Sequence, residues 1–386
     1  MANVSSSNSH KERVPKLRFN DFNKEWSTAA LGDLGTFTKG APLSKADISD
    51  TGNPFILYGE LYTTYPEITT SIVRKTLKTA TTECLSRVGD VIIPTSGETP
   101  EEIATATCVM LSNVILAGDL NIYRNSTVDG RFISYIINHV VNGDISRIAQ
   151  GKSVVHIKAD ELSKIVIHYP ERAEQQKIID FLYLLDTKIA KQRQMIDMLK
   201  SYKRGAIEQY FSTQQGNKNW TKTTISNCLF YEQPQKYIVH SEHYSNTYKT
   251  PVLTANKAFI LGYTNEQDGI YDKGDVLIYD DFTMEVKYVN FPFKVKSSTI
   301  KMLTPQSGID LYFMFTLLQF LDLHPEGHQR SYISILEPME VNIPCYKEQT
   351  RVSKIFRLLD NEIEKEQLLL RTILDLKAAL LQQMFI

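Results

Sequence analysis

The sequence predicts an α/β (α+β) protein in which two domains of mixed α/β fold are separated by two long antiparallel coiled-coil helices. Three observations lead to this fold class. The chain has 386 residues, which is enough to form two or three separate hydrophobic cores. It repeats itself internally, so that its halves are related by a pseudo-twofold repeat. Each copy of the repeat also has a heptad pattern of apolar residues, which is typical of paired helices.

Composition places the chain among ordinary globular proteins. It is 42% hydrophobic and 23% charged, and its formal net charge at pH 7 is −1. This charge gives no compositional sign of a nucleic-acid-binding protein. If the chain binds nucleic acid, positive charge must be concentrated on one surface or be supplied by basic partner subunits.

The beginning of the chain lacks the apolar stretch that a secretory signal requires, and the longest nearly apolar run, 311–321, is about half of what a membrane-spanning helix needs. Four cysteines lie far apart and without CxxC spacing: Cys84, Cys108, Cys228 and Cys345. This pattern argues against a disulfide framework or a zinc site and is typical of free thiols in a reducing compartment. We therefore expect a cytoplasmic protein.

The two variable regions, about 20–150 and 220–327, alternate short apolar segments with turn residues. Strands are predicted at 54–58, 88–94 and 107–111 in the first region, and at 250–253, 275–279 and 298–303 in the second. One apolar helix is predicted near the end of each region, at 130–141 and 308–321. This order predicts two separate mixed α/β domains.

The internal repeat aligns residues 170–211 with residues 344–385 without a gap, at a shift of 174 residues. Eleven of the 42 aligned positions are identical, where unrelated chains would give roughly two or three. The regions before these copies agree more loosely. Trp26 pairs with Trp220, and Gly89-Asp90-Val91 pairs with Gly274-Asp275-Val276, at other offsets.

Each repeated segment is predicted to be one helix, because it follows a proline, begins with acidic residues and has no interior glycine except Gly205. Forty residues make a helix on the order of 60 Å long, which needs a partner. The apolar seam residues are Ile178, Leu182, Leu185, Ile189, Ile196 and Leu199 in the first helix, and Val352, Phe356, Leu359, Ile363, Leu370 and Ile373 in the second. Two matching seams favour pairing with each other over separate packing on each domain.

Polar residues interrupt both seams at matching positions. In an antiparallel pair, Gln192 would meet Glu366 near the middle, and Lys203 and Lys377 would each be an exposed lysine near one end. Polar seam residues weaken a coiled coil but can fix its register.

Several segments resemble the specificity subunits of type I restriction-modification systems, over nearly the whole chain. The opening Val14-Pro15-Lys16-Leu17-Arg18-Phe19, with Trp26 and Leu31-Gly32-Asp33 after it, is similar to the usual opening of that family. The two glycine-aspartate strands, at Gly89 and Gly274, and the segments around Pro170 and Pro344 appear in the family's order. The second copy departs from the pattern: it needs a short gap before Pro344 and keeps less of the glycine-rich approach found at Gln150-Gly151-Lys152-Ser153.

The resemblance implies a non-catalytic subunit that recognises double-stranded DNA. Its first target recognition domain (14–150) and its second (216–327) would each read one half of a bipartite, asymmetric target. The conserved regions 151–215 and 328–386 would form the helices, which set the spacer between the half-sites and dock two methyltransferase (modification) subunits. Those partners, together with translocase/nuclease (restriction) subunits, would hold S-adenosylmethionine, ATP and Mg²⁺, so we expect no cofactor in this chain.

Base reading requires polar side chains on loops that reach the edges of bases. In the first domain the candidates are Tyr58, Glu60, Thr95, Ser96, Glu98, Lys152, Ser153 and His156. In the second domain they are Thr254, Asn256, Lys257, Tyr279, Asp280, Gln329 and Arg330. The sequence does not give the target bases or the spacer length.

Methyltransferase and ATPase motifs are absent. Asn53-Pro54-Phe55 lacks the second proline of an adenine methyltransferase motif, and Gly151-Lys152-Ser153 lacks the earlier glycine of a P-loop.

Two other functions stay open, a Mg²⁺-dependent nuclease and an assembly scaffold. Asp272 with Glu285-Val286-Lys287 is similar to the carboxylate and lysine spacing of Mg²⁺-dependent nucleases. His240 and His243 could bind a metal only with further ligands. The second alternative is a coiled-coil assembly scaffold without DNA affinity.

Overall fold

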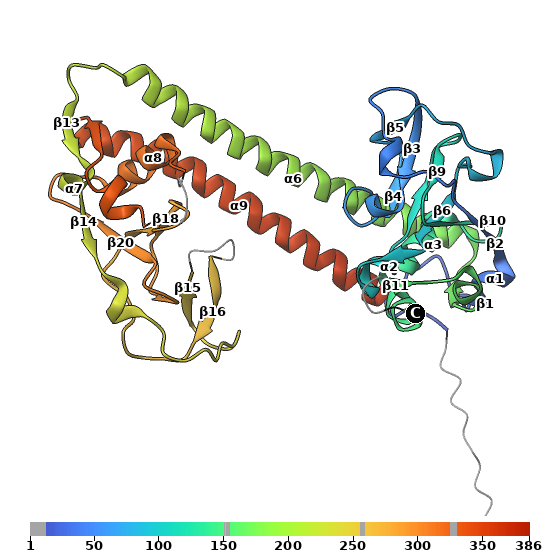
Figure 1. Cartoon of the computed structure of the whole chain (residues 1–386). Helices are drawn as coiled ribbons and strands as arrows, with labels where there is room; N and C mark the ends of the chain where they lie inside the picture. Colours follow the sequence, from blue (N-terminus) through green and yellow to red (C-terminus); the bar gives the residue numbers. More distant parts are fainter. Residues whose placement is uncertain (1–12, 150, 152–154, 255–258, 325–329) are drawn as a thin grey trace, which may run out of the picture. The chain divides into compact units, whose positions relative to one another are not determined.

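The computed structural model describes residues 13–149, 151, 155–254, 259–324 and 330–386 (Figure 1). It confirms a mixed α/β fold with two long helices. The chain divides into two compact units. Unit 1 contains the chain up to Lys191 together with Leu370–Ile386, and unit 2 contains Gln192–Leu369. Each unit therefore holds one globular domain and a segment of both long helices.

The globular part of unit 1 is built on a five-stranded sheet. In spatial order its strands are β2 (Gly35–Lys39), β10 (Leu120–Asn125), β6 (Asp90–Pro94), β8 (Thr107–Val109) and β4 (Ile68–Thr69). Every residue of the central strand β6 is buried, because helix α3 (Gly130–His139) covers one of its faces with Phe132 and Ile133. A second sheet contains β5 (Arg74–Thr76), β3 (Asn53–Leu57) and β9 (Ile115–Ala117).

The globular part of unit 2 has the same plan with different strands. Its four-stranded sheet contains β14 (Leu229–Glu232), β20 (Ile300–Pro305), β17 (Val276–Asp280) and β18 (Val286–Val289), and its second sheet contains β16 (Ile260–Thr264), β15 (Thr250–Leu253) and β19 (Lys294–Val295). Strand β17 is buried throughout, and the apolar helix α8 (Leu311–Leu321) packs on the sheet. The six predicted strands and the two predicted domain helices are all present, with bounds that differ by up to three residues.

Two further pairings close the units and were not predicted. Strand β1 (Ser27–Ala30) pairs antiparallel with β12 (Val166–Tyr169), and β13 (Thr221–Thr224) pairs antiparallel with β21 (Glu340–Ile343). Each pairing joins the start of a domain to the residues just before a long helix. The remaining short elements are α1 (Leu31–Leu34), β7 (Ser96–Gly97), α2 (Pro100–Ile103), α4 (Asn142–Ile148), β11 (Val155–His156), α5 (Ala159–Leu162) and α7 (Ile225–Cys228), with five single turns of other helix types between them.

The two long helices are α6 (Arg172–Gln214) and α9 (Tyr346–Met384), as the repeat predicts. All twelve apolar seam residues are buried or half-buried. Gln192 meets Glu366 as predicted, since its Nε2 atom donates to the Glu366 carbonyl oxygen at 3.1 Å and also to the carboxylate. The prediction of exposed lysines is wrong: only 8% of Lys203 is exposed, and the side chain of Lys377 is 12% exposed. Lys203 is buried and Lys377 is mostly buried, because each is paired with at least one carboxylate.

The glutamine that is identical in the two repeats joins each long helix to its domain. Gln175 is buried, and its Nε2 atom donates to the Pro170 carbonyl oxygen while its Oε1 atom accepts from the amide of Asp129, both at 2.8 Å. Gln349 makes the same two bonds, to Pro344 and Asp310, at 2.9 Å. Asp129 and Asp310 cap helices α3 and α8, so one side chain fixes the start of the long helix against the start of the domain helix.

Aromatic side chains make the equivalent connection at the other end of each repeat. In unit 1, Phe385 contacts Trp26 and Phe132, with ring centroids 6.2 and 5.3 Å apart. The backbone of unit 1 is also joined there, since the amide of Leu17 donates to the carbonyl oxygen of Gln383 at 2.9 Å. The end of α9 therefore completes the core of unit 1.

In unit 2, Phe211 contacts Trp220 and Phe313, at 6.2 and 5.6 Å. The loose sequence match of Trp26 with Trp220 thus reflects a shared place in the packing. Among the residues that the structure describes, no helix is both long and apolar enough to cross a membrane. All four cysteines are free thiols.

Candidate nucleic-acid interface

In unit 1, a loop cluster forms where the central strand β6 ends. The amide of Thr95 donates to the carbonyl oxygen of Asp119 at 2.8 Å, and Ser96 Oγ donates to the Asp119 carboxylate at 2.7 Å. Strand β7 then pairs with β11, so that Ser96 lies opposite His156. The structure therefore brings His156 next to Thr95 and Ser96, although His156 lies 60 residues after Ser96 in the sequence.

Within this cluster, some predicted residues support the loop and others are exposed. Ser96 is buried and its hydroxyl is engaged with Asp119, whereas His156 and Glu98 are exposed and Thr95 is half-buried. Thr99 caps helix α2, and Glu102 accepts from the amide of Glu98 at 2.8 Å. The internal bonds hold the backbone of the loop, and the exposed side chains are available to a ligand.

Two tyrosines border the same cluster. Burial raises the pKa of Tyr62, and the nearby charge of Glu102 together with Tyr58 and Glu98 adds to this effect. Tyr62 was not predicted, although an aromatic residue so close to Tyr58 in a loop was a usable signal. Glu60 has a different place: it is buried, and its carboxylate accepts from Arg74 Nε at 2.7 Å and from the amide of Leu57.

Unit 2 has an equivalent loop cluster where its central strand β17 ends. Asp280 is 4% exposed, and its carboxylate accepts the amides of Phe282 at 2.9 Å and Thr283 at 2.6 Å. The loop closes through Met284, whose amide donates to the Asp280 carbonyl oxygen and whose φ is 60°. The loop is consequently held in one tight conformation.

The segment before the second long helix binds to this loop. The Asp281 carboxylate accepts from the amide of Tyr332 at 2.9 Å and lies 3.2 Å from Lys301 Nζ. Ser331 donates both its amide and its hydroxyl to the Asp281 carbonyl oxygen. Tyr279 is also buried, its hydroxyl lies 2.6 Å from Ser331 Oγ, and burial raises its pKa to about 12.

The exposed residues of the second cluster are Phe282, Thr283 and Arg330. The Arg330 side chain is 67% exposed, and its Nε atom lies 3.9 Å from the Asp281 carboxylate. Phe282 and Thr283 were not predicted, because nothing in the sequence distinguishes the exposed part of this loop from the buried Asp280. Tyr279 and Asp280 support the loop, and Arg330 is the predicted residue that extends from it.

The other predicted residues do not join these clusters. Thr254 lies at the end of β15, in the second sheet of unit 2, where it is buried and its amide donates to the Phe259 carbonyl oxygen at 3.0 Å. Five predicted residues lie outside the described part of the chain: Lys152, Ser153, Asn256, Lys257 and Gln329.

A polar hollow of about 710 Å³ lies at the opposite end of the central sheet of unit 1. Its lining includes four arginines and two aspartates: Arg87, Arg124, Arg131, Arg172, Asp90 and Asp129. Arg124 pairs with Asp90 and Arg131 pairs with Asp129, both at 2.9 Å. Arg87 and Arg172 are exposed, and Arg172 also lies 3.5 Å from the Asp129 carboxylate. The hollow therefore has excess positive charge in a chain whose net charge is −1, which is the kind of local concentration that phosphate binding requires.

The long helices expose large apolar side chains away from their shared seam. These side chains are 62 to 67% exposed and comprise Leu184, Met198, Tyr202, Leu358 and Leu368. Leu184 and Leu358 occupy equivalent positions of the repeat. Each unit thus presents an apolar surface of the kind that protein partners cover.

The structure gives no support to the nuclease alternative. Lys287 on the edge strand β18 places its Nζ atom 3.5 Å from the carboxylate of Glu285, which lies just before that strand, as expected for a surface ion pair. His240 and His243 are exposed, and the carboxylate near them, Glu266, accepts the amide of His240. Across the described ranges no three His, Cys, Asp or Glu side chains are grouped so that they could hold a metal ion.

Comparison with known proteins finds similarity to one family over part of the chain. Residues 23–201 match the family described as Type I restriction modification DNA specificity domain. A relative from Escherichia coli, the Type I restriction enzyme EcoR124I/EcoR124II specificity subunit, is 44% identical over 140 residues. That match covers 34% of this chain and spans 35% of the relative's length.

Two solved structures share the fold over nearly the whole chain. The S subunit of the type I restriction-modification system from M. genitalium superimposes with a TM-score of 0.66 at 15% identity, covering 97% of this chain and 99% of that chain. A chain from work on complex assembly and conformational transition of the type I R-M system gives a TM-score of 0.54 at 15% identity, with coverages of 93% and 97%. At these identities the likeness concerns the fold.

Proposed function

Residues 23–201 match the Type I restriction modification DNA specificity domain, and we propose that the whole chain is the DNA specificity subunit of a type I restriction-modification complex. It recognises DNA and leaves catalysis to partner subunits. Because the target is genomic and foreign DNA, its place of action is the cytoplasm.

The observation that carries this proposal is the duplicated loop cluster. Each unit ends its buried central strand in a rigid loop to which the segment before a long helix is bonded, at Ser96 with His156 and at Asp281 with Ser331. Two similar but non-identical clusters on one chain suit a target of two different half-sites. Rigid backbones with a few exposed polar and aromatic side chains are what base reading requires.

Within the clusters, the exposed and half-buried side chains are the proposed base contacts. In unit 1 these are Tyr58, Tyr62, Thr95, Glu98 and His156, and in unit 2 they are Phe282, Thr283 and Arg330. Arg330 is suited to a guanine, because its guanidinium fork matches the O6 and N7 acceptors. Arg87 and Arg172 in the polar hollow are proposed to contact DNA phosphates, which sets position without sequence preference.

The helices set the distance between the half-sites and dock two methyltransferase subunits. The exposed Leu184 and Leu358 support this role, because equivalent apolar surfaces in the two repeats fit two copies of one partner. S-adenosylmethionine, ATP and Mg²⁺ then belong to the methyltransferase and restriction subunits.

Methylation-aware sequencing tests the proposed function. The chain would be expressed with its methyltransferase subunit in cells whose DNA lacks other adenine methylation, and the methylated motif would be read from the genome. A bipartite, asymmetric motif with one spacer length is expected. A continuous motif, or no methylation with both subunits present, would contradict the proposal.

A pair of variants separates the proposed function from the scaffold alternative. Arg330→Ala should relax one half-site and leave the other unchanged, and His156→Ala should do the reverse. A scaffold without DNA affinity would give the same motif in both variants, because the sequence would then be read by another subunit.

A further inference from the structure

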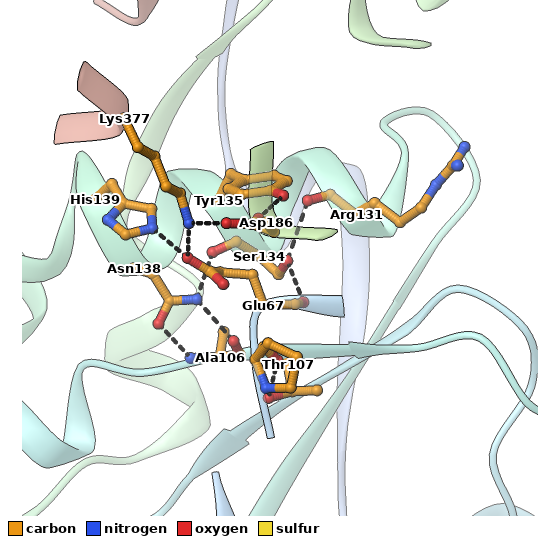
Figure 2. A network of polar contacts seen from close by, with 11 residues as sticks. Glu67, Ala106, Thr107, Arg131, Ser134, Tyr135, Asn138, His139, Asp186 and Lys377 are labelled. Atoms are coloured by element: carbon orange, nitrogen blue, oxygen red, sulfur yellow. Dashed lines mark hydrogen bonds and ion pairs between the residues drawn. The ribbon is translucent and has the colours of Figure 1, made fainter. Parts of the chain in front are cut away.

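A buried polar cluster joins three elements of unit 1 at one lysine (Figure 2). Lys377 from α9 places its Nζ atom 2.5 Å from Asp186 Oδ1 on α6 and 2.9 Å from Glu67 Oε1. Tyr135 from α3 donates its hydroxyl to the other oxygen of Asp186 at 2.5 Å. His139 Nε2 lies 2.6 Å from the same oxygen of Glu67. We call Lys377, Asp186, Glu67, Tyr135 and His139 the unit 1 node.

The backbone around Glu67 is fixed as well, so the unit 1 node is not a loose surface pairing. The Glu67 carbonyl oxygen accepts from Ser134 Oγ at 2.7 Å and from the amide of Cys108 at 2.8 Å. Burial would raise the pKa of Glu67, but the bond with His139 and the charge of Lys377 outweigh it and lower that pKa to about 2. The carboxylate of Glu67 is therefore ionised at neutral pH and balances Lys377.

Unit 2 contains the same arrangement with the helices exchanged. Lys203 from α6 lies 2.7 Å from both oxygens of Asp360 on α9, and the Tyr312 hydroxyl from α8 donates to Asp360. The lysine ammonium also faces the ring of Phe315 at 5.6 Å. We call Lys203, Asp360 and Tyr312 the unit 2 node.

The two nodes follow from one pattern in the repeat. Asp186 is equivalent to Asp360, and Lys203 is equivalent to Lys377, so each long helix has one aspartate and one lysine at the same spacing. An antiparallel pair places the aspartate of each helix against the lysine of the other. A parallel pair would place aspartate against aspartate and lysine against lysine, which is unfavourable in a partly buried seam.

The apolar seam alone does not determine the register, because it repeats every seven residues. If α9 slipped by one heptad, Asp186 would face Leu370 or Met384 in place of Lys377, and Gln192 would face Leu359 or Ile373 in place of Glu366. The seam would still be apolar, but buried carboxylates would lose their partners. Within the seam, the polar nodes therefore distinguish registers that the apolar seam residues leave nearly equivalent. The packing of Phe211 and Phe385 on their own domains favours the same register.

We propose that Lys203 and Lys377 are positioning residues that select one register of α6 against α9 and so restrict the complex to one spacer length between the half-sites. This rests on the proposed function. Each lysine acts through its node, which ties a domain helix to both long helices within its unit. A slip of one heptad moves the helices by about 10 Å, which corresponds to roughly three base pairs of B-DNA.

Spacer sequencing tests the functional part of the proposal in the full chain with its methyltransferase subunit. The K203M/K377M double variant should methylate sites with the same half-sites but with additional spacer lengths. We expect the fraction of methylated sites with a non-native spacer to rise at least about tenfold, which corresponds to about 1.4 kcal/mol of register preference. K203R/K377R keeps the charges and should keep the native spacer.

A matched control separates positioning from simple loss of stability. The I189A/I363A variant makes two cavities in the same seam and leaves both nodes intact, so it should lower the melting temperature without changing the spacer. If K203M/K377M keeps a single spacer, or if I189A/I363A broadens the spacer equally, the proposal is overturned.

Disulfide trapping measures the register without DNA. Gln192→Cys with Glu366→Cys should cross-link in the wild-type background, and Gln192→Cys with Leu359→Cys or Ile373→Cys should cross-link only when Lys203 and Lys377 are replaced. Cross-linking of the native pair alone in both backgrounds would refute register selection. If the wild-type chain produced no bipartite methylation, the proposed function would fail, while the trapping result would still decide whether the lysines select the register.

Discussion

In units 1 and 2, the same types of residue on the long helices contact domains of different sequence. The two units differ in the side chains that each domain contributes to these contacts. Both use a glutamine at the start of the long helix, a phenylalanine at its end and an aspartate-lysine pair between them. In unit 1, the domain adds a second carboxylate, Glu67, which is itself bonded to His139. In unit 2, Lys203 has the single carboxylate Asp360, and an arginine, Arg357, stacks beside it on Tyr288 and Tyr312.

This comparison shows how a few shared helix residues can join two domains of different sequence. The repeat keeps the residues that face the other long helix, and each domain supplies a tyrosine from a different turn of its own helix, Tyr135 from the second turn of α3 and Tyr312 from the first turn of α8. The tyrosine is therefore equivalent in contact but not in sequence alignment. Requirements on the domain are few, which leaves the rest of its sequence free to vary.

The largest expected difference between the units concerns the terminal phenylalanines. Phe211 contacts Trp220, Phe313 and Phe320 besides the neighbouring Tyr210, whereas Phe385 contacts Trp26 and Phe132. Each Phe→Ala change should destabilise its own unit by about 3–5 kcal/mol, with the larger loss for Phe211. Denaturant titration of each variant measures this. Equal losses would mean that the additional aromatic contacts of unit 2 add nothing.

The lysines give the next difference. Lys377→Met leaves two half-buried carboxylates, Asp186 and Glu67, without this cation, so it should destabilise unit 1 by about 3 kcal/mol. Lys203→Met leaves only Asp360 and should cost about 2 kcal/mol in unit 2. Thermal melting of both variants tests the order. Adding Glu67→Gln should recover part of the loss in Lys377→Met, and the opposite result would remove Glu67 from the node.

Acid should affect unit 1 through Glu67. Its pKa is lowered to about 2, so its ionised form stabilises the folded chain above the ordinary value of about 4.5, and this stabilisation is lost as the pH falls toward 2. The loss is on the order of 3 kcal/mol. Burial and the charge of Glu67 raise the pKa of Asp186, which opposes part of this loss.

The matched variant for this pH dependence is Glu67→Gln. The difference in unfolding free energy between the wild-type chain and this variant should be largest above pH 5 and should shrink between pH 4.5 and 2. Urea titration across that range measures it, and a difference that stayed constant would show that the ionised carboxylate is not what stabilises the node.

The loop clusters differ in the kind of contact that they offer, and specificity should show it. Arg330→Ala should cost about 1–3 kcal/mol of discrimination at one base pair of one half-site, because a guanidinium fork is lost. His156→Ala should have a smaller effect in the other half-site, since an imidazole makes a single bond. Competition binding of the assembled methyltransferase complex to singly substituted targets measures both.

The smallest expected effect is at the stacked arginine of unit 2. The Arg357 guanidinium lies 4.6 Å from the ring centre of Tyr312 and its side chain is 44% exposed. Arg357→Ala should cost about 0.5–1 kcal/mol, and Arg357→Lys should cost less. Thermal melting compares the two variants. A loss as large as that of Lys203→Met would make Arg357 a member of the unit 2 node.

The fold was largely predictable because it depends on periodic patterns. The heptads and the 174-residue repeat identified α6, α9 and the Gln192–Glu366 contact from the sequence. The lysines were misjudged because a heptad pattern places Lys203 and Lys377 in the seam but does not show the aspartates beside it. Asp186 and Asp360 flank the seam and reach the lysines only across the helix pair.

The candidate site was less predictable, because its residues come from loops. The sequence indicated which strand ends carry the site, and Thr95, Ser96 and His156 do lie together. It could not distinguish Asp280, which holds the loop, from Phe282 and Thr283, which the loop exposes. That distinction depends on backbone hydrogen bonds that leave no periodic pattern.

The last turn of α9 completes the core of unit 1, so the first domain of the chain depends on residues that are synthesised last. Unit 2 is contiguous, so all of it is synthesised before residues 370–386. The synthesis of unit 1 begins first, but its core is incomplete until Leu381, Met384 and Phe385 are made, because these residues fill the core beside Trp26. A chain that ended before those residues would expose apolar core residues of unit 1 while unit 2 already had its whole sequence, so the first domain synthesised is the last to become stable.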